Sequence, residues 1–170
     1  MLIGNNNSFD IFFSRYIISY LIITILIIRI LTLENLHYLL MKANSMFAKR
    51  VMLEANKIGL TSGQPKVLYF LSKFKEADQK TIANYLEIEQ TTVGSILLGM
   101  ENAGLIVRKQ HNGNRRSLYV SLTEKGVEAS NYMDKVFEDI ESIAVNEISK
   151  EDEEKLKELL MKMCQSLRGV

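Results

Sequence analysis

Two neighbouring stretches of the sequence carry side chains suited to contacts with nucleic acid. The first is uncharged and offers amide and hydroxyl groups, which hydrogen-bond to base edges and to backbone phosphates. The second is basic, and no acidic residue lies between Glu101 and Glu124. Guanidinium groups there can pair with phosphates or enter a narrow minor groove. We therefore predict DNA contacts from Gln90, Thr91, Thr92, Ser95, Arg108, Arg115 and Arg116.

The uncharged stretch lies in a helix-turn-helix pattern. A short helix is predicted from about Gln79 to Leu86, followed by a tight turn and a second helix that begins at about Gln90. Ala83 is small enough to let the two helices cross closely. In this motif the outer N-terminal residues of the second helix face a DNA groove. The turn holds Glu87 where glycine is common, so we expect a slightly different turn geometry.

The basic stretch is predicted to form a β-hairpin wing. A strand begins with Leu105, Ile106 and Val107, directly after Gly104, which ends the preceding helix. The cluster 111–114 contains an Asn-Gly step, a strong hairpin signal. Residues 115–122 then alternate in polarity and indicate the returning strand. A hairpin directly after a helix-turn-helix predicts a winged helix-turn-helix lobe.

Helices are also predicted ahead of this lobe. Apolar residues at helical spacing indicate one helix over 34–58, which ends at Gly59. The next helix is expected to open at Thr61, because Gln64 completes a capping-box pattern and Pro65 falls in the first turn.

Two amphipathic helices are predicted after the hairpin, the first capped by Thr123 and the second beginning at Ser149 and Asp152. The apolar stripe of the second contains Leu156, Leu159, Leu160, Met163 and Leu167. Long amphipathic helices outside a small domain usually bury their stripes in one another or in a second subunit. We therefore predict a homodimer whose fold is mainly α, with a small β-hairpin wing on a helix-turn-helix lobe and a helical dimerisation region.

The N-terminal residues 1–33 differ from the rest of the chain. They contain ten isoleucines and no Ala, Val, Lys or Glu. Three interpretations remain open: a membrane anchor, a hydrophobic extension buried in a dimer interface, or upstream sequence translated from a start codon chosen too early. In the first case the basic residues Lys42, Lys49 and Arg50 would place the C-terminal part in the cytoplasm.

The overall composition narrows the class of protein. The single cysteine, Cys164, excludes an intramolecular disulfide and favours a reducing, cytoplasmic setting. Because Cys164 lies beside an apolar stripe, we expect it to be packed. The sequence shows no metal-ligand spacing, no nucleophile–base pair and no glycine-rich phosphate loop, so we predict neither an enzyme nor a cofactor. The formal net charge is only +1, so DNA binding must depend on where the charges lie.

As an ordered set, these motifs resemble the MarR family of bacterial regulators. The matching run is Leu60-Thr61-x-x-Gln64-Pro65 with Val67-Leu68, the helix-turn-helix, Gly104-Leu105-Ile106, Asn114-Arg115-Arg116 and Leu122-Thr123-x-x-Gly126. The resemblance covers roughly residues 34–168. It implies a dimer with two winged lobes on a palindromic operator and, in many members, release by a small ligand bound between the lobe and the dimer helices.

Two departures from the family pattern affect the predicted interface. The family commonly has an aspartate before the wing arginines, where this sequence has Asn114, and a neutral amide cannot form the salt bridge that orients an arginine. No Lys or Arg lies between Gln90 and Glu101, and Ser95 and Gly99 occupy exposed positions that are often basic. We therefore expect the wing to carry most of the positive charge.

These observations predict four segments: the apolar extension 1–33, a dimerisation helix 34–58, a winged helix-turn-helix lobe 60–122 and dimerisation helices 123–170. The expected function is sequence-specific binding of double-stranded DNA by a transcriptional regulator, usually a repressor. The alternative is a winged-helix adaptor or membrane-tethered module that binds proteins and little DNA. Membrane association would require that residues 1–33 be present and inserted.

Overall fold

The computed structural model describes residues 7–32, 35–111 and 114–169. The chain divides into two compact units, Met1–Met46 and Phe47–Val170, which are described separately. The first unit contains helix α1 (Asn7–Thr32) and the beginning of α2 (Leu36–Lys57). The side chains of residues 15–27 in α1 are all exposed, although most of them are apolar. In the part of the chain that the structure describes, no helix combines the length and apolar character needed to cross a membrane.

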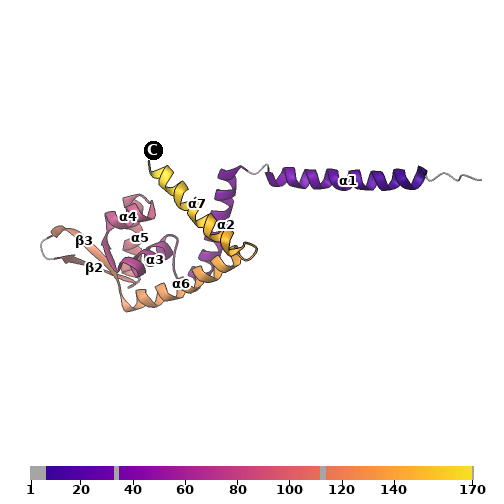
Figure 1. Ribbon diagram of the computed structural model, residues 1–170. Coiled ribbons are helices and arrows are strands. Elements are labelled where there is room, and N and C mark those ends of the chain that lie inside the picture. The colour runs from indigo at the N-terminus through magenta and orange to yellow at the C-terminus, as the bar shows by residue number, and fades with distance from the viewer. Residues whose placement is uncertain (1–6, 33–34, 112–113, 170) are drawn as a thin grey trace, which may run out of the picture. The chain divides into compact units, whose positions relative to one another are not determined.

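The second unit has the predicted fold, mainly helical with a small antiparallel sheet. After the end of α2 it contains α3 (Gln64–Phe74), β1 (Glu76–Asp78), α4 (Gln79–Leu86), α5 (Gln90–Asn102), β2 (Ile106–His111), β3 (Asn114–Leu122), α6 (Glu124–Ala144) and α7 (Lys150–Arg168). Figure 1 shows α3, α4 and α5 clustered beside the hairpin of β2 and β3, with α6 extending from that cluster to α7.

The core of this unit is built around α3. Its apolar face buries Val67, Leu68, Phe70 and Leu71, each at most 2% exposed. Apolar residues from the other elements complete the core, among them Ile82, Ala83, Val93, Leu97, Met100, Ile106, Val120 and Met133. Fully burying one such aliphatic or aromatic side chain contributes roughly 1.5–3 kcal/mol, so this cluster holds the helix-turn-helix against the sheet and α6.

The start of α3 differs from the prediction. The helix begins at Gln64 and not at Thr61, and its N-cap is Gly63 in a left-handed conformation (φ 86°). The side chain of Gln64 does accept a hydrogen bond from the backbone N–H of Thr61 at 2.9 Å, which is one half of a capping box. The left-handed turn at Gly63 prevents the helical path from starting earlier, because its backbone lies outside the helical region.

The sheet contains one strand that the sequence pattern did not predict. The strand order is β1-β3-β2, and both pairs are antiparallel. The added strand, β1, has only three residues, and Ala77 is its buried position. Such a short strand has too few residues to show an alternating pattern. It anchors the base of the predicted hairpin to the residues that precede α4.

The beginning of α6 is fixed by two contacts. Thr123 is the N-cap, as predicted: its hydroxyl oxygen accepts a hydrogen bond from the Gly126 N–H at 3.0 Å, and the same hydroxyl donates to the Gly104 carbonyl oxygen at 2.7 Å. Gly126 packs so tightly against the backbone of Leu105 that a Cβ atom there would lie well under 3.0 Å from the Leu105 carbonyl oxygen. The start of α6 is therefore locked onto the residues that lead into β2.

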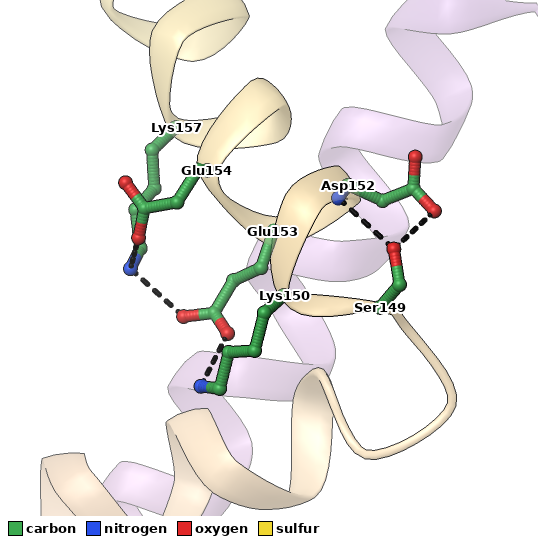
Figure 2. A network of polar contacts seen from close by, with 6 residues as sticks. All are labelled: Ser149, Lys150, Asp152, Glu153, Glu154 and Lys157. Atoms are coloured by element: carbon green, nitrogen blue, oxygen red, sulfur yellow. Dashed lines mark hydrogen bonds and ion pairs between the residues drawn. The ribbon is translucent and has the colours of Figure 1, made fainter.

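The beginning of α7 also follows the prediction (Figure 2). The Ser149 hydroxyl accepts a hydrogen bond from the Asp152 N–H at 3.1 Å and donates to the Asp152 carboxylate at 2.7 Å. The carboxylate of Glu153 lies 2.8 Å from the ammonium groups of both Lys150 and Lys157. These two lysines lower the pKa of Glu153 to about 2, because they favour its charged form.

The position of Cys164 contradicts the expectation that it is packed. Its side chain is exposed, and α7 contains no buried residue among those the structure describes. The reason is that α7 does not pack against the hydrophobic core of its own chain. The predicted stripe is correspondingly exposed, with Leu159 at 51% and Leu167 at 71%.

Candidate nucleic-acid interface

The first helix of the helix-turn-helix, α4, is capped at both of its ends. The Asp78 carboxylate accepts a hydrogen bond from the Thr81 N–H at 2.8 Å and so caps α4. Hydrogen bonds from Thr81 lower the pKa of Asp78 by favouring the carboxylate. At the other end of α4, Glu87 adopts a left-handed conformation (φ 52°), and the Ile88 N–H donates to the Ala83 carbonyl oxygen at 3.1 Å. The turn therefore has the left-handed geometry that glycine usually occupies. Glu87 adopts it with some backbone strain, because its Cβ atom disfavours this conformation.

Helix α5 presents the four predicted recognition residues on its exposed surface. Gln90, Thr91, Thr92 and Ser95 are all exposed. The opposite side of α5 is fixed in the core by Val93, Leu97 and Met100, each 0% exposed. The sequence prediction of which residues face outward agrees with this geometry, while contact with DNA stays a prediction.

Two hydrogen bonds define the start of this surface. The Ser95 hydroxyl donates to the Thr91 carbonyl oxygen at 3.3 Å, which orients it along the helix. The amide of Gln79, the first residue of α4, donates to the Gln90 carbonyl oxygen at 2.8 Å. The beginnings of α4 and α5 are therefore tied directly together, and the exposed side chains are carried by a rigid pair of helices.

The wing is formed by β2 and β3. Val107 pairs with Ser121, Arg108 with Val120 and Lys109 with Tyr119, and the register shifts between Gln110 and His111. The turn residues 112–113 lie outside the described residues. Arg115 and Arg116 belong to β3, but their side chains also lie outside the described residues.

Arg108 is placed differently from the predicted contacts on α5. Its Nε lies 2.9 Å from a carboxylate oxygen of Glu101 in the last turns of α5, and its side chain is only 19% exposed. The guanidinium charge is thus already compensated within the chain. Its backbone position in β2 is at the base of the wing, opposite Val120.

A cavity of about 390 Å³ lies where the helix-turn-helix meets the sheet. It is lined by Asp78, Gln79, Lys80, Gln90, Arg108, Leu118 and Val120. Lys80 is exposed, and it brings a positive charge close to Gln90 that sequence reasoning did not assign to the site. The available signal was its place as the second residue of α4, the first helix of the helix-turn-helix.

Two further cavities lie along α6, each of about 320 Å³. One lies between α2 and α6 and includes Arg50, Glu54 and Asp139 among its lining residues. The pKa of Glu54 is lowered by hydrogen bonds from Lys57 at 2.7 Å and from the Tyr132 hydroxyl at 3.0 Å, so its carboxylate is charged at neutral pH. The other cavity lies between α3, β3 and α6 and is lined by Leu71, Ser72, Lys73, Lys75, Ser121, Leu122, Val127, Ser130, Asn131 and Asp134.

Comparison with known proteins supports the winged helix-turn-helix fold described above. The sequence model of the MarR family matches residues 60–118. This range includes all of α3, the helix-turn-helix and most of the wing. A chain from Listeria monocytogenes, described as a MarR-family transcriptional regulator and complexed with a 26mer DNA, is 19% identical with a TM-score of 0.76. That match covers 79% of this chain and 90% of the other. No curated protein matches the chain.

Two further solved structures share the fold. The MepR–DNA complex of S. aureus is 24% identical with a TM-score of 0.72, and the match covers 78% of this chain and 98% of that one. A MarR-family protein of Mycobacterium tuberculosis in complex with salicylic acid is 21% identical with a TM-score of 0.60, and 76% of this chain and 96% of that chain are covered. Residues 60–118 therefore match the MarR family model, and the winged helix-turn-helix fold of this chain is shared with solved MarR-type structures.

Proposed function

We propose that the chain binds a palindromic operator as a homodimer and represses nearby genes. The observation that carries this proposal is the exposed hydrogen-bonding surface of α5, made of Gln90, Thr91, Thr92 and Ser95 and fixed by the buried face of the same helix. Neutral amide and hydroxyl groups at the start of a recognition helix can distinguish bases in the major groove. The basic wing strands supply the phosphate contacts that this helix lacks.

The exposed apolar face of α7 supports the homodimer. Leu156, Leu159, Leu160 and Leu167 are 39–71% exposed in the single chain, and in the same unit Leu53 of α2 and Ile143 of α6 are also more than half exposed. A second copy of the chain that covers these residues would bury them from water. In such a dimer two recognition helices about 34 Å apart would enter successive major grooves on one face of the duplex.

We further propose that a small organic acid releases the DNA. The cavity between α3, β3 and α6 lies where the lobe meets a predicted dimer helix, and it combines Lys73 and Lys75 with hydroxyl and amide groups. A carboxylate bound there would contact both parts at once and could shift the spacing of the two lobes. The salicylic acid complex of the related M. tuberculosis protein is consistent with this class of ligand.

DNA binding is tested by fluorescence anisotropy of the full chain at several salt concentrations. The probes are the upstream region of its own gene and a scrambled duplex, and operators are also selected from random DNA. The Arg115→Ala/Arg116→Ala variant is compared with Lys150→Ala/Lys155→Ala, which removes the same charge from exposed positions on α7. We expect preferential, salt-sensitive binding that the wing variant loses and the α7 variant keeps.

The outcome that contradicts the proposal is a folded dimer that selects no sequence and binds no probe even at low salt. That result would favour the adaptor, because a protein-binding module does not need the wing arginines. With about six phosphate contacts per dimer, affinity should fall steeply between 50 and 200 mM salt. Binding that is indifferent to salt would contradict the electrostatic role of the wing.

A further inference from the structure

Arg108 and Glu101 form the ion pair that joins the recognition helix to the wing. Glu101 lies in the last turns of α5 and Arg108 lies in β2, and their side chains are 40% and 19% exposed. Among the described residues, the Nε of Arg108 is buried and makes no hydrogen bond. The Glu101 carboxylate at 2.9 Å is therefore what offsets the burial of this charge.

The backbone between the two residues is already a rigid turn. Gly104 is left-handed (φ 71°), its N–H donates to the Glu101 carbonyl oxygen at 2.9 Å, and the Leu105 N–H donates to the Met100 carbonyl oxygen at 2.9 Å. The ion pair adds a side-chain link on top of this turn. Because β2 continues from Arg108 toward the wing tip, a small rotation at its base would move the wing arginines by a larger distance.

We propose that Arg108 is a positioning residue, which through Glu101 fixes the direction of the wing relative to α5 and does not itself contact DNA. This inference rests on the proposed DNA-binding function and differs from the sequence-based prediction of Arg108 as a DNA contact. An arginine whose side chain is paired and only 19% exposed cannot easily reach a phosphate unless it first breaks the pair. An arginine that forms no such ion pair needs no such rearrangement.

The test uses three variants of the full chain: Arg108→Gln, Glu101→Gln and the charge swap Glu101→Arg/Arg108→Glu. Each is measured by anisotropy on the selected operator and on scrambled DNA, at salt concentrations from 50 to 200 mM. We expect each single variant to weaken operator binding by about fivefold to tenfold, as for neighbouring residues that are energetically coupled. The swap should restore most of the affinity, and the dependence on salt should stay that of the parent.

A direct phosphate contact predicts a different pattern. Arg108→Gln would then lower the slope of log affinity against log salt by about one per contact, whereas Glu101→Gln would leave affinity unchanged or increase it. The swap would bind worst of all, because it places a carboxylate against the DNA. Any of these three results overturns the proposal.

Thermal unfolding of each variant separates positioning from loss of the fold. A swap that restores the unfolding temperature but not DNA affinity also overturns the proposal, since the pair would then serve stability alone. If the parent chain selects no DNA at all, the proposed function fails as well. If the parent binds and only the swap fails to recover, the DNA-binding function stands and the positioning role of Arg108 is wrong.

Discussion

Gly126 is the residue at which the fold leaves least room. A Cβ atom there would collide with the backbone carbonyl oxygen of Leu105, and backbone cannot move aside as the end of a flexible side chain can. Gly99 in α5 provides a contrast, because a Cβ atom there would meet only the side-chain amide of Gln64, at 3.4 Å. The two glycines therefore have different reasons for being in their helices.

We predict that Gly126→Ala lowers the free energy of unfolding by about 1–3 kcal/mol, the usual cost of overpacking. Gly99→Ala should be neutral or stabilising by up to about 1 kcal/mol, since alanine is the better helix former. Denaturant-induced unfolding of both variants measures this difference. A Gly126→Ala variant as stable as the parent would show that α6 can shift away from Leu105 without cost.

Gly99 also allows a test of a recognition helix that has no lysine or arginine. Gly99→Lys adds a positive charge to an exposed position of a helix that has no Lys or Arg. We predict tighter binding to operator and scrambled DNA alike, and an increase in the salt slope of about one for each lysine that reaches a phosphate. Gly99→Ala serves as the control without added charge. Unchanged binding to both probes would indicate that this part of α5 does not approach the DNA.

At the scale of the element, Thr123 determines where α6 begins. Its hydroxyl accepts from the Gly126 N–H and donates to the Gly104 carbonyl oxygen, so one side chain connects α6 to the end of α5. We predict that Thr123→Ala lowers the free energy of unfolding by about 1 kcal/mol. Thr123→Ser should lower it by much less, because serine keeps the capping hydroxyl. Equal losses in both variants would point to the methyl group, which serine lacks, as the stabilising part.

The cap of α4 makes stability depend on pH. Hydrogen bonds from Thr81 lower the pKa of Asp78 below its ordinary value of 3.8 in the folded chain. A lowered carboxyl pKa contributes stability above the unfolded value, and this contribution is lost as the pH falls through the folded value. Asp78→Asn keeps an N-cap but removes the titration. We therefore expect the free energy of unfolding to fall less steeply in this variant than in the parent between about pH 5 and about pH 2.

The elements differ in how far the sequence could predict them. The helices α4 and α5, and the caps at Thr123 and Ser149, depend on contacts within a few residues, and each was predicted close to its observed position. The strand β1 could not be predicted because it exists only through its pairing with β3, more than forty residues later.

In the candidate site, too, the features set by local sequence could be predicted and those set by tertiary contacts could not. The exposed positions of α5 follow from helical periodicity, and so the outward-facing side chains were correctly predicted. The pairing of Arg108 with Glu101 depends on how the turn after α5 brings strand and helix together. No local pattern distinguishes an arginine paired in this way from one that extends into solvent. The Lys80 cavity likewise requires residues from α4, α5 and the sheet to converge.

At the scale of the whole molecule, the apolar stripe of α7 is left open to solvent, because this helix buries no side chain among the described residues. If the proposed homodimer forms, we predict that Leu160→Glu in the full chain converts it to a monomer, because the substitution places a charge in the proposed interface. Met161→Glu is the matched control, since Met161 is 60% exposed and lies outside the apolar stripe. Light scattering after size-exclusion chromatography measures the mass. A dimer that survives both substitutions would place the interface elsewhere.

The absence of lysine and arginine from α5 has a consequence for how such a protein would search a genome. Non-specific attraction to DNA comes mainly from neutralised phosphates, and competing sites in a genome number about 10⁶ to 10⁹. A regulator that keeps its recognition helix free of lysine and arginine is held less strongly at those competing sites. More of its copies then remain unbound and available to the operator, so a small number of molecules per cell can occupy it.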